Sequence, residues 1–150
     1  MDKKVPCPDY LFETCRVVPV VVIKDLSDTI PTLSAMCDGG IPVAEVCAEA
    51  EVPYLPGCMT PTEIMAALEL GITTVKFFPA NVYGGLKAIK ALAAPFPQVK
   101  FLPTGGVDLS NIKEFLDCDK IAAVGGSFMM KGTADDIREN CRQLCALLAE

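Results

Sequence analysis

The sequence contains no histidine and no tryptophan among its 150 residues. Without histidine, the chain cannot form a Ser-His-Asp triad, a Cys-His pair or a histidine-containing zinc site. It also has no run of basic residues, and its net charge of -6 argues against a nucleic-acid partner. Its eight cysteines form no Cys-X-X-Cys pair, so we expect neither a metal site nor a disulfide framework.

Long apolar runs are also missing. The longest, Val17–Ile23, is far shorter than the ~18 residues that a membrane span needs, and residues 1–10 lack the apolar core of a signal peptide. Most cysteines lie inside apolar segments, where a free thiol behaves as a small hydrophobe in a reducing compartment. We therefore predict a cytoplasmic protein without membrane association, and a single domain spanning residues 1–150.

The sequence does contain an alternation of strand and helix patterns. Short apolar runs rich in β-branched residues predict strands that are buried on both faces of a parallel sheet. The predicted strands are Val17–Ile23, Ile41–Cys47, Val52–Cys58, Thr73–Pro79, Val99–Pro103 and Ile121–Val124. The predicted helices are Asp28–Asp38, Pro61–Leu70, Gly85–Ala94, Asn111–Leu116 and Thr133–Ala149. Ser27, Thr60 and Ser110 are predicted to cap the first, second and fourth helix. The fold class is α/β.

One interval breaks the alternation. Four of the five intervals between strand starts exceed 20 residues, whereas the second is about half as long, with only four residues between Cys47 and Val52. A parallel crossover needs about a dozen residues. Either the second and third strands pair as a hairpin, or a segment that ordinarily lies between them is missing.

Two lone charges lie in predicted strands. Lys76 stands among Val75 and Phe77, and a lysine that loses hydration there has a lowered pKa and can attack a carbonyl carbon to form a Schiff base. The alternative is a lysine whose ammonium reaches solvent at the strand end. Glu45 is either a general acid-base or one half of an ion pair at the end of its strand. Asn81 and Tyr83 follow the lysine strand and are candidates for the rim of the site.

Glycine-rich turns are associated with the last two predicted strands, at Pro103–Gly106 and Gly125–Ser127. Glycine lets backbone N–H groups approach an anion closely, and Thr or Ser adds a hydroxyl. In barrels of alternating strands and helices, the loops after the last two strands often bind phosphate. The pair therefore predicts a phosphate site, with ordinary turn geometry as the alternative.

Taken together, these segments resemble the 2-keto-3-deoxy-6-phosphogluconate (KDPG) aldolases, which also act as 4-hydroxy-2-oxoglutarate aldolases. The resemblance covers Arg16 to about Lys131 and rests on VVPVVVI, GGIPVAEV, VPYLPGCMTPTE, GITTVKFFPA, PFPQVKFLPTGGV and AAVGGSFM, in this order. It implies a TIM-type (β/α) barrel of the class I aldolase kind and a trimer. It also implies keto-acid and sugar-phosphate substrates, and Schiff-base chemistry without a cofactor or metal.

The resemblance also implies roles for individual residues. Lys76 would form the Schiff base and Glu45 would shuttle protons. Thr104 would touch the substrate and Phe78 would wall the site. The phosphate would be held by Gly105, Gly106, Gly125, Gly126 and Ser127. The reaction implied is cleavage of KDPG to pyruvate and glyceraldehyde 3-phosphate, or of 4-hydroxy-2-oxoglutarate to pyruvate and glyoxylate.

The sequence departs from the family pattern between Cys47 and Val52. Glu49 stands in the place of an arginine that binds the substrate carboxylate, and the family's third and fourth strand segments are missing. At ~25 residues per strand–helix unit, the shortfall is roughly 50–60 residues, which leaves six parallel strands of eight.

Three functions stay open on these residues. The chain is an active or weakly active aldolase, or it is an inactive remnant that still binds phosphate or assembles with other chains. The third alternative is a phosphate-binding barrel enzyme of another reaction type, similar to thiamine phosphate synthase.

Overall fold

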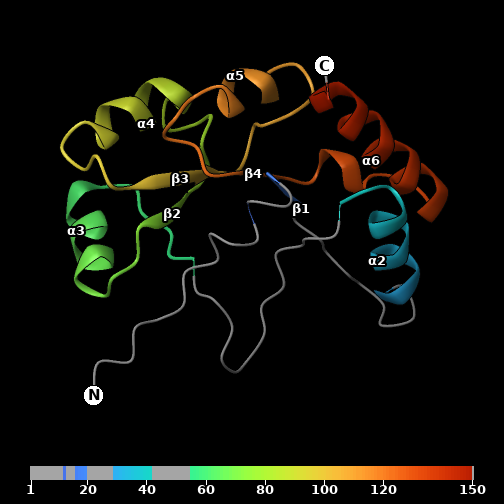
Figure 1. Ribbon diagram of the computed structural model, residues 1–150, viewed down its shortest axis with the longest axis horizontal. Helices are drawn as coiled ribbons and strands as arrows, with labels where there is room; N and C mark the ends of the chain where they lie inside the picture. The colour runs from blue at the N-terminus through green and yellow to red at the C-terminus, as the bar shows by residue number, and fades with distance from the viewer. Residues whose placement is uncertain (1–11, 13–15, 20–28, 42–54, 150) are drawn as a thin grey trace.

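The computed structural model describes residues 12, 16–19, 29–41 and 55–149 (Figure 1). The strands are β1 (Val17–Pro19), β2 (Thr74–Phe77), β3 (Lys100–Pro103) and β4 (Val124–Gly126). The helices are α2 (Thr29–Asp38), α3 (Pro61–Glu69), α4 (Gly85–Ala93), α5 (Ile112–Leu116), the 3-10 helix η2 (Phe128–Met130) and α6 (Ala134–Ala149). Within these ranges, no helix is both long and apolar enough to cross a membrane.

The strands form one parallel arc. β2 pairs with β3, and β1 pairs with β4. Isolated parallel bridges connect Gly57 with Lys76, Phe101 with Ile121, and Thr104 with Gly125. The order across the arc is therefore residues 55–58, β2, β3, β4 and β1, all parallel, as a barrel segment requires. The predicted strand Ile41–Cys47 lies outside the described residues except for Ile41.

The last predicted strand was placed too early. The sequence predicts Ile121–Val124, but β4 begins at Val124 and includes both glycines. Gly125 and Gly126 pair with Val18 and Pro19 of β1, so they are strand residues rather than a turn after the strand. Glycine was read as a strand terminator, yet here the missing side chains allow close packing within the sheet.

The described part of the predicted strand Val52–Cys58 forms a single bridge rather than a strand. The N–H of Lys76 donates to the carbonyl of Pro56 at 2.8 Å, and the N–H of Cys58 donates to the carbonyl of Lys76 at 2.9 Å. Pro56 has no N–H of its own, which limits the ladder to this short contact.

The helices agree with the predicted ranges to within one residue at each end. Thr60 caps α3 as predicted, in a capping box: its hydroxyl accepts from the N–H of Glu63, whose carboxylate accepts from the N–H of Thr60 at 2.9 Å. The predicted cap Ser110 is wrong, because its hydroxyl and N–H both donate to the carboxylate of Asp108. Asn111 takes the N-cap position instead, and the predicted cap Ser27 lies outside the described residues.

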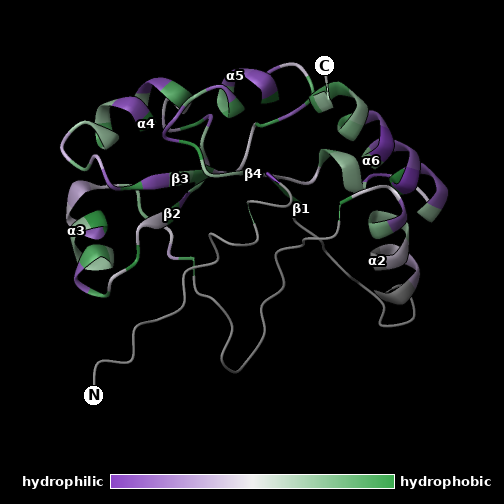
Figure 2. Cartoon of the chain, in the orientation of Figure 1, coloured by the Kyte–Doolittle hydropathy of each residue, from purple (hydrophilic) through white to green (hydrophobic). Residues whose placement is uncertain are grey.

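Alternation along the strands separates two apolar groups. Val75, Phe77 and Phe101 are buried in the core beneath the helices, which Figure 1 shows along the outside of the arc. Along these helices, hydrophilic and hydrophobic residues alternate in Figure 2, as expected for helices with one buried face. Val18 and Leu102 point to the opposite face of the strands, where they form a separate buried cluster with Phe12 and Ala123. We call these the outer and the inner face.

Candidate functional site

Lys76 occupies an inner-face position on β2. Its neighbours Val75 and Phe77 are buried on the outer face, and successive strand residues point to opposite faces. Its register partner on β3 is Leu102, a member of the inner cluster. Lys76 is half-buried there. The fold therefore places Lys76 beside an apolar cluster on the inner face.

Phe78 connects Lys76 with the first glycine turn. The Nζ atom of Lys76 lies 5.6 Å from the centroid of the Phe78 ring, within the range of a cation–π contact. The same ring lies close to Gly105, where a Cβ would stand 3.1 Å from Cε2 of Phe78. Phe78 itself is 54% exposed. Phe78 therefore lies near both the amine of Lys76 and the first glycine of the turn.

In the turn after β3, the backbone N–H groups of two glycines point away from residues 80–81. Gly105 and Gly106 have φ of +88° and +83°, which favours glycine. The N–H of Ala80 donates to the carbonyl of Thr104 at 2.8 Å, and the N–H of Asn81 donates to that of Gly105 at 3.1 Å. In a planar trans peptide, the carbonyl and the following N–H point in opposite directions. The N–H groups of both glycines therefore face away from residues 80–81, as an anion site would need.

Thr104 carries a buried hydroxyl that lacks a partner. The residue is 4% exposed, and among the described residues its Oγ1 is a buried polar atom with no hydrogen bond. A Cβ on Gly125 would lie 2.2 Å from this oxygen, so glycine at 125 leaves the space that the hydroxyl occupies on the inner face. Buried polar groups are nearly always paired. An unpaired one on the same face as Lys76 points to a ligand.

Gly126, at the end of β4, lies close to the chain that follows the turn after β3. A Cβ there would stand 3.0 Å from the ring of Phe128 and 3.5 Å from the carbonyl of Val107. Ser127 follows directly and is exposed. The fold thus brings Lys76 and most of the predicted phosphate residues to one end of the arc. Glu45 and Glu49 lie outside the described residues.

Cys58 lies next to Lys76 in the sheet, but its thiol is not a second candidate nucleophile. Its N–H bonds the carbonyl of Lys76, but its side chain is buried in the outer core. Burial, and secondly the charge of Glu63, raise the pKa of the Cys58 thiol. Because the thiolate is the reactive form, Cys58 stays protonated and structural at neutral pH.

Asn111 shapes the turn after β3, a role that the sequence pattern did not predict. Asn111 was predicted only as the first residue of a helix, but its Nδ2 donates to the carbonyl of Gly106 at 2.8 Å. Its Oδ1 accepts from the N–H of Asp108 at 3.0 Å. Both ends of the amide therefore fix the glycine turn from one side. An asparagine shortly after a Gly-Gly pair is a typical loop-bracing residue, and that signal was available.

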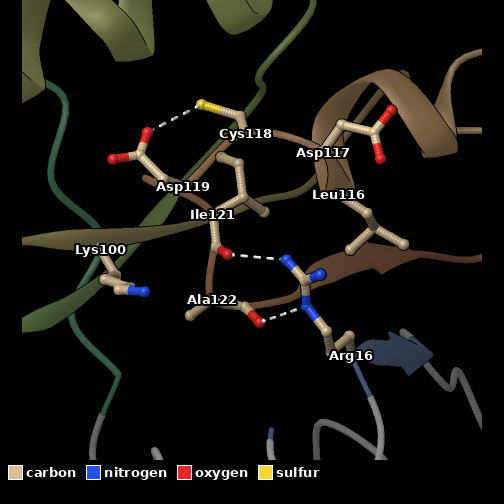
Figure 3. Close-up of a pocket in the computed structure, with 8 residues that line it drawn as sticks. All are labelled: Arg16, Lys100, Leu116, Asp117, Cys118, Asp119, Ile121 and Ala122. Carbon is tan, nitrogen blue, oxygen red and sulfur yellow. Dashed lines mark hydrogen bonds between the residues drawn. The ribbon is translucent and has the colours of Figure 1, made fainter.

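A hollow lies near the amino-terminal ends of the strands, at the end opposite to Lys76 (Figure 3). It has a volume of about 340 Å³, with Lys100 and Arg16 at its sides. The Arg16 guanidinium donates to the carbonyl of Ile121 at 2.9 Å and to that of Ala122 at 3.3 Å. Arg16 thereby connects the start of β1 with the chain that leads into β4. In parallel α/β folds the chemistry lies at the carboxyl ends of the strands, so we assign this hollow a structural role.

Comparison with known proteins matches residues 42–143 to the family model of KDPG and KHG aldolase. The chain is 38% identical to the KHG/KDPG aldolase of Escherichia coli K12, covering 84% of this chain and 86% of the relative. It is 44% identical to the 2-dehydro-3-deoxy-phosphogluconate aldolase of Haemophilus influenzae over 59% of this chain, but spans only 42% of that relative. The fold matches KDPG aldolase from Legionella pneumophila with a TM-score of 0.83 at 28% identity, covering 92% of this chain and 98% of that one. KDPG aldolase of Zymomonas mobilis ZM4, solved with 3-phosphoglycerate, matches with a TM-score of 0.82 at 26% identity, covering 93% and 95%.

The comparison also measures how much shorter this chain is. The alignment to the E. coli protein runs over 183 residues, whereas 84% of 150 residues is 126, so about 57 aligned positions have no counterpart in this chain. This agrees in size with the predicted shortfall. The predicted location of this shortfall, between Cys47 and Val52, lies outside the described residues.

Proposed function

Since the chain belongs to the KDPG and KHG aldolase family, we propose that it is a Schiff-base aldolase that cleaves KDPG, 4-hydroxy-2-oxoglutarate or both. The observation that carries this proposal is the inner-face position of Lys76, in register with Leu102 and with its Nζ 5.6 Å from the centroid of the Phe78 ring. The Legionella relative was captured with pyruvate as a covalent carbinolamine intermediate, which supports the same chemistry here.

The proposed reaction begins at Nζ of Lys76. The neutral amine attacks the C2 carbonyl of the keto acid, and loss of water gives a protonated imine. Glu45 removes the proton from the C4 hydroxyl, the C3–C4 bond breaks, and its electron pair moves into the imine to give an enamine. The aldehyde leaves, a proton returns from Glu45 to C3, and hydrolysis of the imine frees pyruvate and Lys76.

The other predicted residues bind the two ends of the substrate. We propose that the Thr104 hydroxyl pairs with the keto-acid portion, which would satisfy its missing hydrogen bond. Gly105, Gly106, Gly125, Gly126 and Ser127 would hold the phosphate of the aldehyde portion with backbone N–H groups and a hydroxyl. The Zymomonas relative solved with 3-phosphoglycerate supports a phosphate-binding role for this fold.

The test is chemical trapping. The purified chain is incubated with millimolar pyruvate and borohydride, and peptide mass spectrometry locates the reduced adduct. We expect modification of Lys76 and its loss in Lys76→Met. The matched control is Lys100→Met, which removes a lysine from the neighbouring strand β3. Lys100 is the register partner of Thr74 on β2. Absence of an adduct on Lys76 in the folded wild-type chain would overturn the proposal.

The second candidate function is an inactive remnant that binds phosphate or assembles with other chains. The observation in its favour is the shortfall of about 57 residues relative to the E. coli protein. We propose one incomplete barrel domain, whose uncovered strand edges would invite pairing with a second copy. Normal turnover of KDPG by the 150-residue chain would exclude this candidate.

We further propose a cytoplasmic homo-oligomer, a trimer by resemblance to the family. The support for a reducing compartment is that most cysteines lie in apolar segments of the sequence, where a free thiol behaves as a small hydrophobe. Light scattering coupled to size exclusion measures the assembly, and a monomer at micromolar concentration would contradict this part of the proposal.

A further inference from the structure

Gly125 lies on the inner face of β4, directly beside the Thr104 hydroxyl. Ala123 belongs to the inner cluster and Val124 to the outer core, so alternation along the strand places Gly125 on the inner face. A Cβ at residue 125 would stand 2.2 Å from Oγ1 and 3.2 Å from Cβ of Thr104. The first distance is shorter than any van der Waals contact. The hydroxyl oxygen therefore occupies the space that a side chain at 125 would need.

The surroundings of Gly125 leave no other room for a side chain. Its backbone pairs with Val18 of β1 on one side and forms a parallel bridge with Thr104 on the other. The same Cβ would also stand 3.1 Å from Cδ2 of Leu102, which is 1% exposed. Because the interior is close-packed and side chains occupy discrete rotamers, a residue larger than glycine would turn the Thr104 side chain. The hydroxyl would then point elsewhere.

The direction of this hydroxyl matters because its partner is not supplied by the described part of the chain. Thr104 is buried, and no described residue hydrogen-bonds its Oγ1. Leu102, two residues earlier on the same face, is the register partner of Lys76. A keto acid bound to Lys76 would thus share the inner face with the hydroxyl, and its oxygens accept hydrogen bonds.

We propose that Gly125 is a positioning residue, whose missing side chain holds the Thr104 hydroxyl in the rotamer that donates to the keto-acid portion of the substrate. This role is separate from the phosphate contact proposed for the glycine backbones, because alanine at 125 would keep the backbone N–H. The inference rests on the proposed function, since it takes Thr104 as a partner of the keto acid on Lys76.

The test is a double-mutant cycle of Gly125→Ala and Thr104→Ala, measured as the pyruvate concentration that half-saturates borohydride trapping on Lys76. Each single change should raise this concentration about tenfold, as loss of a hydrogen bond to a charged group predicts. In the Thr104→Ala chain the hydroxyl is already absent, so adding Gly125→Ala should change it less than about twofold. Effects that multiply would overturn the assignment. If Gly125→Ala alone does not fold, the double variant, which lacks the clashing oxygen, is compared with Thr104→Ala and decides in the same way.

Gly39→Ala is the matched control for loss of stability. A Cβ at residue 39 would stand 2.4 Å from Cβ of Cys141 on α6, a clash of similar size away from the inner face. This variant should unfold at lower urea concentration, whereas its half-saturating pyruvate concentration should stay within about twofold of the wild-type value in the folded protein. A rise as large as that of Gly125→Ala would overturn the assignment, because lost stability would then explain both.

The wild-type chain separates this inference from the proposed function. Absence of its adduct on Lys76 contradicts the proposed function, whereas an adduct together with multiplying effects overturns the role of Gly125 alone. Turnover gives a second readout: Gly125→Ala should raise KM for KDPG and for 4-hydroxy-2-oxoglutarate by the same factor, because both contain the keto acid. A rise confined to KDPG would assign the effect to the phosphate and overturn the role proposed here.

Discussion

The outer and inner faces of the strands carry different kinds of side chain. On the outer face, Val75, Phe77 and Phe101 are each at most 1% exposed and lie beneath the helices. Phe77 and Phe101 meet edge to face, with centroids 6.4 Å apart. On the inner face, positions of the same strands hold the amine of Lys76 and the unpaired hydroxyl of Thr104. Among the described residues, the outer face buries apolar side chains, whereas the inner face combines a buried apolar cluster with these two polar groups.

This difference shows how one short sheet divides its tasks. Because successive residues point to opposite faces, a change at one position can lower stability and a change at the next can alter the site. Substitutions on each face should therefore give separable results in unfolding and in pyruvate trapping. The following predictions test that separation, from the largest expected effect to the smallest.

The largest loss of stability is expected from Phe101→Ala on the outer face. Phe101 is 0% exposed and packs against Phe77. Truncating a buried phenylalanine leaves a cavity and costs ~3–5 kcal/mol. Urea unfolding followed by circular dichroism should show this fall in the free energy of unfolding. The fraction that stays folded should still trap pyruvate on Lys76.

The control for this variant is Lys100→Ala in the same strand. Lys100 is exposed, so its free energy of unfolding should change by less than about 0.5 kcal/mol. A folded Phe101→Ala protein that has lost trapping altogether would show that the two faces are not separable.

A smaller effect of opposite sign is expected from Thr104→Val on the inner face. Valine keeps the shape of threonine but removes the buried hydroxyl that has no partner among the described residues. Relief of an unpaired buried hydroxyl should raise the free energy of unfolding by ~1 kcal/mol. Pyruvate should at the same time bind less tightly, because the hydroxyl is proposed to pair with the substrate.

Thr104→Ser serves as the comparison, because it keeps the hydroxyl and removes a methyl group. It should retain pyruvate trapping and lose stability. Reduced stability in Thr104→Val, together with unchanged trapping, would mean that the hydroxyl has a structural partner and is not part of the site.

The sequence predicted the outer face better than the inner one. Strand and helix positions follow from apolar periodicity and capping residues, so the sequence predicts the Thr60 cap and the five described α-helices to within one residue, but not the 3-10 helix η2. Lys76 was singled out because a charge is rare inside an apolar strand. Its distance to the Phe78 ring could not be predicted, since it depends on how the chain turns after β2.

The missed features depend on contacts between segments far apart in the sequence. The glycines at 125 and 126 were read as a turn, because nothing local indicates that β1 pairs beside them. The clamp of Asn111 on Gly106 needs the loop after β3 to fold back first. The sequence pattern of a segment predicts its secondary structure, but it does not predict which distant segment the residues contact.

The smallest effect is expected at a surface carboxylate that belongs to neither face. The Glu63 carboxylate accepts from the N–H groups of Met59 and Thr60 and from the Thr60 hydroxyl. These hydrogen bonds, the one from Met59 first, lower the pKa of Glu63. A carboxyl with a lower pKa in the folded chain adds stability at neutral pH, which is lost as the pH falls through that lowered value.

Glu63→Gln should therefore flatten the acid side of the stability profile without altering the site. Glutamine can still accept from the cap, but it does not titrate. Unfolding midpoints measured at a series of acidic pH values should fall less steeply in this variant than in the wild-type chain. Asp108 and Asp136, whose pKa values are lowered by Ser110 and Thr133, keep their share of the slope. Pyruvate trapping at neutral pH should be unchanged, as in the control Glu69→Gln at the other end of α3. A change in pyruvate trapping in Glu63→Gln would contradict this prediction. It would mean that the α3 cap contributes to the inner-face site.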